Sequence, residues 1–167
     1  VIVIGAGGFG REALDTIEAH NAASPETALH VLGVADDSPS PVNLERLEAR
    51  GYKHLGGIET AFASRPGVSS VIAIGTPSVR RKIARALADA GVPTVSVFHP
   101  TAIIGSEFVH GEGAVVCAGA VISTNVRFGD YVHVNPGAVI GHDSTLRDAV
   151  SINPNSTVSG ECSIANE

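Results

Sequence analysis

The second half of the chain places a hydrophobic residue at every sixth position. Counted from Phe98, eleven of the twelve positions in this register are apolar, and His110 is the exception. The twelve positions are Phe98, Ile104, His110, Val116, Ile122, Phe128, Val134, Ile140, Leu146, Ile152, Val158 and Ile164. Ordinary strands would be spaced irregularly, whereas a constant period of six is typical of a parallel β-helix. We therefore expect a β-helix domain over residues 98–167.

The hexads resemble those of the left-handed type of β-helix, in which three hexads make one triangular coil. Twelve hexads then predict about four coils, with residues eighteen apart lying one above the other. We call the twelve positions of this register the landmarks. The residue after a landmark is often glycine or asparagine, as at Gly105, Gly111, Gly129, Asn135, Gly141 and Asn153. We expect tight corners with unusual backbone angles there. The pattern stops in mid-register and the first residue is not methionine, so we expect both ends to be trimmed.

Residues 1–97 show a different pattern, in which strand-like and helix-like segments alternate. Short apolar runs predict buried strands at 1–4, within 29–37, at 71–74 and at 94–97. Helical patterns lie between them, at 11–19, 43–51 and 79–91. Strands that alternate with helices predict a small parallel, doubly wound α/β domain before the β-helix.

Composition narrows the class of protein. Hydrophobic residues make up 44% and charged residues 17%, which indicates a packed core rather than disorder. The net charge of −6 argues against nucleic-acid and anionic-membrane partners. Two cysteines are too few for a disulfide scaffold, and no apolar run is long enough to span a membrane. We expect a cytoplasmic protein.

A glycine-rich loop follows the first predicted strand and precedes the first predicted helix. It contains Gly5, Gly7, Gly8 and Gly10 in the pattern GxGxxG. Glycines let the backbone approach a phosphate, and a helix N-terminus supplies N–H donors and positive dipole charge. The loop therefore predicts diphosphate binding, and the alternative is a plain tight turn.

Polar residues and a further glycine end the next two strands. Asp36 and Asp37 end the second, where an acid can hold a ribose hydroxyl, and Gly75 ends the third. These loops converge on the carboxyl edge of one sheet, where open α/β sheets bind ligands. The alternative for the two acids is a solvated turn. Arg80 is the member of a basic helical run that lies closest to this edge, although a solvated face explains the run equally well.

His142 is the candidate general base among the histidines of the β-helix, because Asp143 follows it directly and can orient the imidazole. Because one coil is eighteen residues, we expect the Gly160 backbone to lie one coil above His142, where its N–H can stabilise an oxyanion. The same coil length places Cys117, Asn135 and Asn153 one above the other. The alternative to a functional role for this stack is that it caps the corner of the β-helix structurally. Cys117 has no base at a suitable spacing. No close histidine pair suggests a metal site, so we expect none.

Taken together, these motifs resemble the NeuD/PglD family of bacterial sugar acetyltransferases. The resemblance covers nearly the whole chain and includes the segments GAGGFGRE, AIGTPSVRRKI, FHPTAIIG and VNPGAVIGHDSTL. It implies a Rossmann-like domain followed by a left-handed β-helix, assembled as a homotrimer that binds acetyl-CoA between neighbouring β-helices. The acceptor is then a sugar or a nucleotide-linked amino sugar such as a UDP-sugar.

The resemblance also implies roles for single residues. His142 matches the catalytic base, Asp143 its acidic neighbour, and Asn135 an active-site asparagine. Gly160 matches the amide that holds the acetyl carbonyl. Some members carry a second histidine nine residues after the base; Ser151 stands there in this chain, and we expect it to contact acetyl-CoA together with Gly160.

The glycine loop, Asp36 and Asp37 match the part that holds the nucleotide-sugar in N-acetylating members. Two other classes of function stay open at this stage. One is an NAD-binding oxidoreductase-like protein with a structural β-helix, and the other is a non-catalytic trimeric scaffold.

Overall fold

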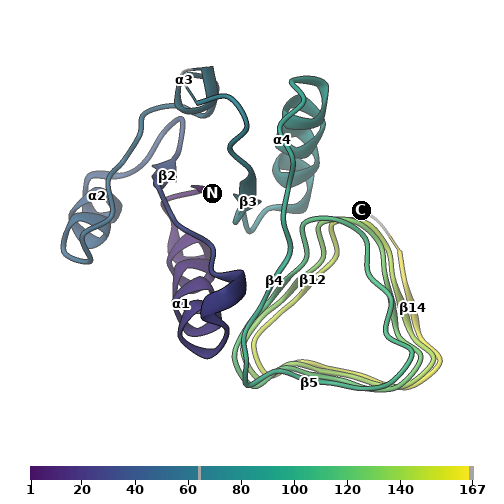
Figure 1. The fold of residues 1–167 in the computed structure, drawn as a ribbon. Helices are drawn as coiled ribbons and strands as arrows, with labels where there is room; N and C mark the ends of the chain where they lie inside the picture. The colour runs from purple at the N-terminus through teal and green to yellow at the C-terminus, as the bar shows by residue number, and fades with distance from the viewer. Residues whose placement is uncertain (64, 166–167) are drawn as a thin grey trace.

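The computed structural model describes residues 1–63 and 65–165, which form an α/β domain followed by a triangular β-helix (Figure 1). The expected fold class is confirmed. The last two residues of the expected β-helix domain, 166 and 167, lie outside the described residues.

The α/β domain is built on a parallel sheet of three strands in the order β2-β1-β3. The strands are β1 (Ile2–Ile4), β2 (Gly33–Ala35) and β3 (Ser70–Ile72), and every one of their residues is buried. Burial on both faces explains why these segments read as continuous apolar runs.

Helices cover both faces of this sheet, as expected for a doubly wound domain. They are α1 (Gly8–Ala23), α2 (Pro41–Glu48), α3 (Ile58–Ala63) and α4 (Pro77–Asp89), with a short 3₁₀ turn, η1 (Pro25–Thr27). Val3 packs on one face with Leu14 of α1, and Ile4 on the other with Leu87 of α4. Helix α3 was not predicted, because six residues are too few to show a helical period.

The expected fourth strand at 94–97 joins the sheet only at its start. Thr94 makes an isolated parallel bridge to Ser70, and Val97 already belongs to the first strand of the β-helix. The chain leaves the sheet after that single bridge because Val97 pairs with Val115 of the next coil instead. A short apolar run predicts a strand but not the sheet it joins.

The β-helix consists of two-residue strands that stack into three parallel sheets. Their orders are β12-β9-β6-β4, β13-β10-β7-β5 and β14-β11-β8. Each pairing joins residues eighteen apart, such as Ile103 with Val121, so the expected coil length is confirmed. The strands are β4 (Val97–Phe98), β5 (Ile103–Ile104), β6 (Val115–Val116), β7 (Val121–Ile122), β8 (Arg127–Phe128), β9 (His133–Val134), β10 (Val139–Ile140), β11 (Thr145–Leu146), β12 (Ser151–Ile152), β13 (Thr157–Val158) and β14 (Ser163–Ile164).

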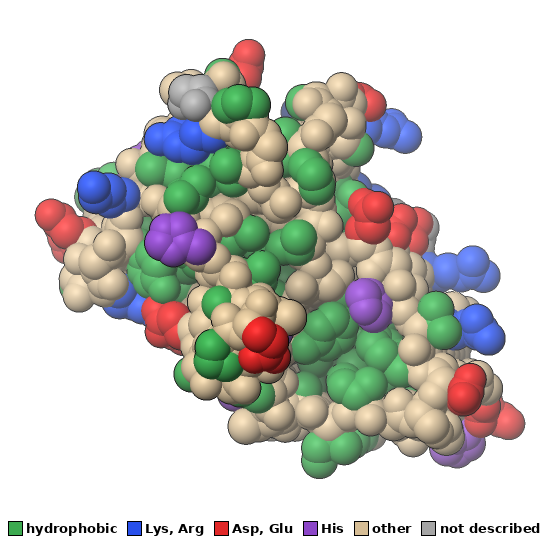
Figure 2. Space-filling view, viewed as in Figure 1, with side chains coloured by type: hydrophobic (Ala, Val, Ile, Leu, Met, Phe, Trp, Pro, Cys, Tyr) green, Lys and Arg blue, Asp and Glu red, His purple; other side chains and the backbone are tan. Residues whose placement is uncertain are grey.

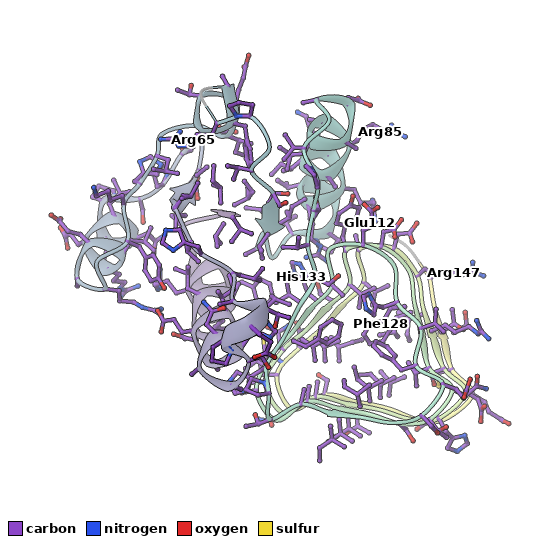
Figure 3. The ribbon with its side chains drawn as sticks, viewed as in Figure 1. Arg65, Arg85, Glu112, Phe128, His133 and Arg147 are labelled. Atoms are coloured by element: carbon purple, nitrogen blue, oxygen red, sulfur yellow. The ribbon has the colours of Figure 1, made fainter. Side chains whose placement is uncertain are left out.

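The landmark side chains fill the triangle. Ile122, Val134 and Ile140 are fully buried, and Phe128 points into the interior in Figure 3. Hydrophobic side chains are visible within the triangle at the end of the β-helix that faces the viewer in Figure 2. His110, the one polar landmark, is exposed and its ring lies 5.6 Å from that of Phe108. An end coil therefore accepts a residue that an inner coil would exclude.

The unusual backbone angles at the corners do not lie at the expected residues. Left-handed backbone occurs every sixth residue, with φ between 54° and 68°, at Glu107, Gly113, Gly119, Asn125, Tyr131, Gly137, Asp143, Ala149, Asn155 and Glu161. These residues stand three positions after the landmarks, not one. Gly105 has no such angle, and a Cβ there would lie 2.7 Å from the Ser123 carbonyl carbon. Glycine after a landmark is thus required by the close approach of the next coil.

A buried arginine joins the two domains. Arg80 of α4 has 0% exposure and donates to the carbonyl of Ile74, 2.7 Å away, at the end of the β3 segment. It also donates to Nδ1 of His133 at 2.8 Å, to the carbonyl of Ala149 and to Oγ of Ser151 at 2.8 Å, all in the β-helix. Arg80 does lie at the carboxyl edge of the sheet, as expected, but the solvated position is wrong, because the β-helix docks over it.

The partners of His133 define its protonation state. Arg80 can only donate, so Nδ1 accepts, and Nε2 donates to the carbonyl of Ile72 at 3.0 Å. The ring stacks on Phe9 with 4.4 Å between centroids, and Figure 3 shows His133 between the two domains. Burial, and then the Arg80 charge, hold the pKa of His133 well below its usual value. The domain junction thus contains a neutral imidazole.

The junction should weaken as the pH falls. Unfolded His133 has a pKa of about 6.5, so below that pH the unfolded state binds a proton that the folded state resists. The stability contribution is complete above pH about 6.5 and is lost progressively as the pH drops toward the lowered folded pKa. Thermal unfolding monitored by circular dichroism between pH 8 and 5 measures this loss as a falling Tm.

The matched variant is His133→Gln, whose side-chain carbonyl can accept from Arg80 and whose amide can donate to Ile72 without titrating. Its Tm should fall less steeply with decreasing pH than that of the wild type, because the other histidines are the same in both proteins. Equal slopes would show that His133 does not couple protonation to folding.

Candidate active site

His142 lies on the corner of the β-helix farthest from the α/β domain. It follows β10 and precedes β11, at the meeting of the sheets of β13-β10-β7-β5 and β14-β11-β8. The α/β domain packs on the third sheet, where Val97 and Val115 share a core cluster with residues of α1. In Figure 1 the His142 corner is the one between β5 and β14, opposite that third sheet.

His142 and Asp143 form a hydrogen-bonded pair. Nδ1 of His142 lies 2.6 Å from Oδ2 of Asp143, and the two side chains are 57% and 44% exposed. The other carboxylate oxygen, Oδ1, accepts from the amide of Asn125 at 2.5 Å. The Asn125 hydrogen bond, followed by that of His142, lowers the pKa of Asp143. An ionised Asp143 selects the Nδ1–H tautomer, which leaves Nε2 as the basic nitrogen.

Gly160 lies directly against this imidazole, so the stacking expected from the eighteen-residue coil is confirmed. A Cβ at residue 160 would be 2.6 Å from Nε2 of His142. The buried hydroxyl of Ser144 donates to the carbonyl of Ser159 at 3.0 Å and accepts from the N–H of Cys162 at 3.2 Å. Ser144 therefore fixes the backbone on both sides of Gly160.

Asn135 stands at a different corner of the same coil, separated from His142 by β10. Its amide donates to the carbonyl of Ile152 at 2.7 Å, so it caps the coil above. The register of β6, β9 and β12 confirms that Cys117, Asn135 and Asn153 stack. Burial raises the pKa of the Cys117 thiol to about 11, which leaves it un-ionised and a poor nucleophile at neutral pH.

The four glycines of the N-terminal loop fall into two pairs. Gly5 has φ +112°, and a Cβ there would lie 2.7 Å from the carbonyl oxygen of Ala73. A Cβ on Gly10 would overlap the carbonyl oxygen of Gly5. Gly7 and Gly8, at the start of α1, face open space instead. The first pair is needed for packing, and the second leaves the helix N-terminus accessible to an anion.

Asp36 and Asp37 lie at the carboxyl edge of the sheet, as expected. Oδ2 of Asp36 accepts from the N–H of Ala6 in the glycine loop at 2.8 Å, and Oδ1 accepts from Ser38 at 2.9 Å. Oδ1 of Asp37 accepts from the N–H of Ile58, the first residue of α3, at 2.8 Å. Both acids therefore hold backbone at this edge. Gly75 has open space where a Cβ would be.

The structure thus brings the sequence-predicted residues into two groups. The glycine loop meets Asp36 at the sheet edge, while His142, Asp143 and Gly160 meet on the far corner of the β-helix. Within one chain the two groups lie on opposite sides of the third β-helix sheet. Ser151, expected at the acetyl-CoA site, lies at the domain junction and accepts from Arg80.

Sequence reasoning missed Asn125 and Ser144. Counting eighteen residues back from Asp143 leads to Asn125, so the coil length contained a signal for it. Ser144 stands at an interior position, where a serine among mainly apolar residues indicates a buried polar role.

Within residues 1–63 and 65–165, no group of three or more His, Cys, Asp or Glu side chains could hold a metal ion. In the same part of the chain, no helix is both long and apolar enough to cross a membrane.

The fold and this site define a hexapeptide-repeat β-helix protein with an N-terminal α/β domain. Residues 1–87 match the family model of the PglD N-terminal domain, and the chain belongs to that family. This agrees with the resemblance found in the sequence motifs. A search of curated proteins found no match.

Several solved structures are similar. WeeI from Acinetobacter baumannii AYE has a TM-score of 0.80 at 27% identity, covering 97% of this chain and 73% of that one. PerB from Caulobacter crescentus, in complex with CoA and GDP-perosamine, has a TM-score of 0.68 at 21% identity and covers 99% and 88%. The acetyltransferase domain of PglB from Neisseria gonorrhoeae FA1090, in complex with acetyl coenzyme A, has a TM-score of 0.62 at 23% identity and covers 97% and 85%. The latter two likenesses show the shared fold.

The two glycine pairs should respond oppositely to an added methyl group. Gly10→Ala forces the new Cβ into the Gly5 carbonyl, so we expect overpacking to cost about 1 to 3 kcal/mol. Gly8→Ala places the methyl in open space at the first turn of α1 and should leave stability unchanged or slightly higher. Urea unfolding of both variants gives the free energies. Equal destabilisation of the two would contradict the assignment of the pairs.

Proposed function

We propose that this chain is an acetyl-CoA-dependent acetyltransferase that acts on a nucleotide-linked sugar. The observation that carries the proposal is the His142–Asp143 pair packed against Gly160 on a β-helix corner. Membership of the PglD N-terminal domain family supports it, as do the CoA and GDP-perosamine in PerB and the acetyl coenzyme A in PglB. The nucleotide-sugar and acetyl-CoA are cytoplasmic metabolites, so we also assign the protein to the cytoplasm.

The proposed reaction is direct acetyl transfer. Nε2 of His142 takes a proton from the acceptor amine or hydroxyl while that atom forms a bond to the thioester carbonyl carbon. The tetrahedral oxyanion receives a hydrogen bond from a backbone N–H, which we assign to Gly160. The C–S bond then breaks, and the CoA thiolate takes the proton from His142. The Asp143 carboxylate stabilises the imidazolium that forms in between.

We propose that the α/β domain binds the nucleotide diphosphate. Gly7 and Gly8 leave N–H donors at the start of α1 accessible to phosphate oxygens. Asp36, Asp37 and Gly75 border the same sheet edge and are the candidates for contacts to the ribose and base.

We propose Asn135 as a contact to the acceptor, Gly160 as a contact to acetyl-CoA, and Ser151 as a contact to acetyl-CoA from a second copy of the chain, because Ser151 lies at the domain junction. A UDP-linked amino sugar is our first choice of acceptor, with a GDP-linked one as the comparison that PerB suggests.

A homotrimer would bring the two groups of residues together. One chain holds His142 and the glycine loop on opposite sides of a sheet, so a second copy has to supply one of them. Three of the four outward side chains in one row of the sheet next to His142 are apolar: Ile103, which is 64% exposed, Val121, which pairs with it, and Val139, which pairs with Val121; Thr157 ends the row. We propose that this face packs against the neighbouring β-helix.

Removal of the base should strongly reduce turnover without unfolding the protein. His142→Ala should reduce kcat by a factor of about a hundred or more, because general-base catalysis contributes that much. The assay measures free CoA thiol from acetyl-CoA with a panel of UDP-amino sugars, GDP-amino sugars and sialic acid. His20→Ala, in the last turn of α1 on the other domain, is the control and should keep wild-type activity. An active His142→Ala would exclude the assigned role, and an inactive wild type on the whole panel would count against the proposed function.

The assembly can be tested separately from activity. The 17.0 kDa chain should elute with a light-scattering mass of about three protomers. Ile103→Asp introduces a charge on the proposed apolar contact and should give a monomer. Val42→Asp changes an exposed valine on α2 of the other domain and should leave the trimer intact. A monomeric wild type would contradict the assembly.

A further inference from the structure

Asn125 stands one coil away from Asp143 on the corner that carries His142. The two residues are eighteen apart, and both have left-handed backbone, with φ of 57° and 59°. The N–H of Asp143 donates to the carbonyl of Thr124 at 3.2 Å, so the backbones of the two corners are hydrogen-bonded as well. The Asn125 side chain is exposed and faces Asp143 rather than the interior.

The Asn125 amide completes the set of hydrogen bonds around the Asp143 carboxylate. A carboxylate can only accept, so Asn125 presents its NH₂ group to Oδ1, at 2.5 Å. Oδ2 is held at 2.6 Å from Nδ1 of His142. Each carboxylate oxygen therefore has one fixed partner, and the plane of the carboxylate is determined from both sides.

We propose that Asn125 is a positioning residue, which through Asp143 holds the His142 imidazole in the tautomer and orientation needed for proton transfer. This inference rests on the proposed function. Without the amide, an Asp143 side chain that is 44% exposed can rotate and bind water instead. The imidazole then loses its fixed acceptor, and either ring nitrogen can carry the proton.

The backbone alone does not call for asparagine at this corner. Glu107 occupies the same left-handed position one coil away, and Tyr131 and Ala149 occupy the equivalent position at another corner, with φ of 57°, 58° and 57°. The conformation therefore accepts an acid, an aromatic residue or alanine. What distinguishes residue 125 is its neighbour, Asp143, which needs a donor.

Charge adds a second reason for an amide. The residues at this register position along the stack are Glu107, Asn125, Asp143 and Glu161. An acid in place of Asn125 would stack four carboxylates at the spacing of adjacent strands, about 5 Å. The neutral amide separates Glu107 from Asp143 and donates to the carboxylate that works with His142.

The test compares Asn125→Asp and Asn125→Ala with the same two substitutions at Asn155. Asn155 has the same backbone conformation, with φ of 54°, on a different corner of the β-helix. Asn125→Asp keeps the shape of the side chain but replaces the donor with an acceptor, and Ala149 shows that a corner of this kind accepts alanine. Circular dichroism and Tm confirm that all four variants fold.

Both Asn125 variants should lower kcat about tenfold, the factor that corresponds to one charge-assisted hydrogen bond, with both KM values unchanged. Imidazole ¹⁵N NMR gives a readout that needs no substrate: His142 should show the Nδ1–H tautomer in the wild type and a mixture in the Asn125 variants. The pKa of Asp143, followed by carboxyl ¹³C NMR, should rise toward its usual value, since the Asn125 hydrogen bond is the main cause that lowers it. The Asn155 variants should match the wild type in all three measurements.

An unchanged tautomer in Asn125→Asp and Asn125→Ala would overturn the inference, and so would an unchanged kcat in active protein. If the wild type acetylates nothing in the panel, the proposed function fails, and the NMR measurements alone decide whether Asn125 positions His142.

Discussion

The hydrogen bonds between successive coils of the β-helix are the interaction on which the rest of the structure depends. They pair residues eighteen apart without a slip from Val97 with Val115 to Leu146 with Ile164. This register holds the landmark side chains inside and repeats each corner at the same place. It also places Asp143 over Asn125 and Gly160 against His142, so the local chemistry of the candidate site follows from the stacking of backbone.

The corners show how repetition and function share one backbone. Left-handed residues recur every sixth position, and glycine is kept where the next coil comes too close for a Cβ. Glycine is required at position 160 for a similar reason, because the imidazole of His142 occupies the space that a side chain would need. An exposed catalytic pair can be held precisely in this way because its neighbours belong to a rigid repeat rather than to a flexible loop.

The junction between the domains follows a different principle. It depends on one buried arginine, whose donors reach backbone at the end of β3 and three residues of the β-helix. A neutral His133 and the Phe9 ring pack beside it. Because these bonds are directional, they fix the orientation of the proposed nucleotide domain on the coils that carry His142. The orientation in turn leaves the two halves of the proposed site on opposite sides of one chain.

The sequence by itself determined the elements with a strict period and the residues tied to it. The six-residue register predicted the β-helix, its coil length, and the contact of Gly160 with His142. The alternation of strands and helices predicted the doubly wound domain, and the glycine loop and Asp36 met at its edge as expected. Such features are local or repeat at a constant interval, so counting along the chain is enough to find them.

Only the tertiary structure decided the features that depend on contacts at irregular distances in the sequence. Arg80 and His133 are fifty-three residues apart, and nothing in the pattern around either residue predicts their hydrogen bond. The segment at 94–97 leaves the sheet because Val97 pairs with Val115 in the next coil of the β-helix. Both possible partners of the segment, β3 and this coil, lie outside it in the sequence. The separation of His142 from the glycine loop arises in the same way, since a period gives positions within one domain but not the face on which another domain docks.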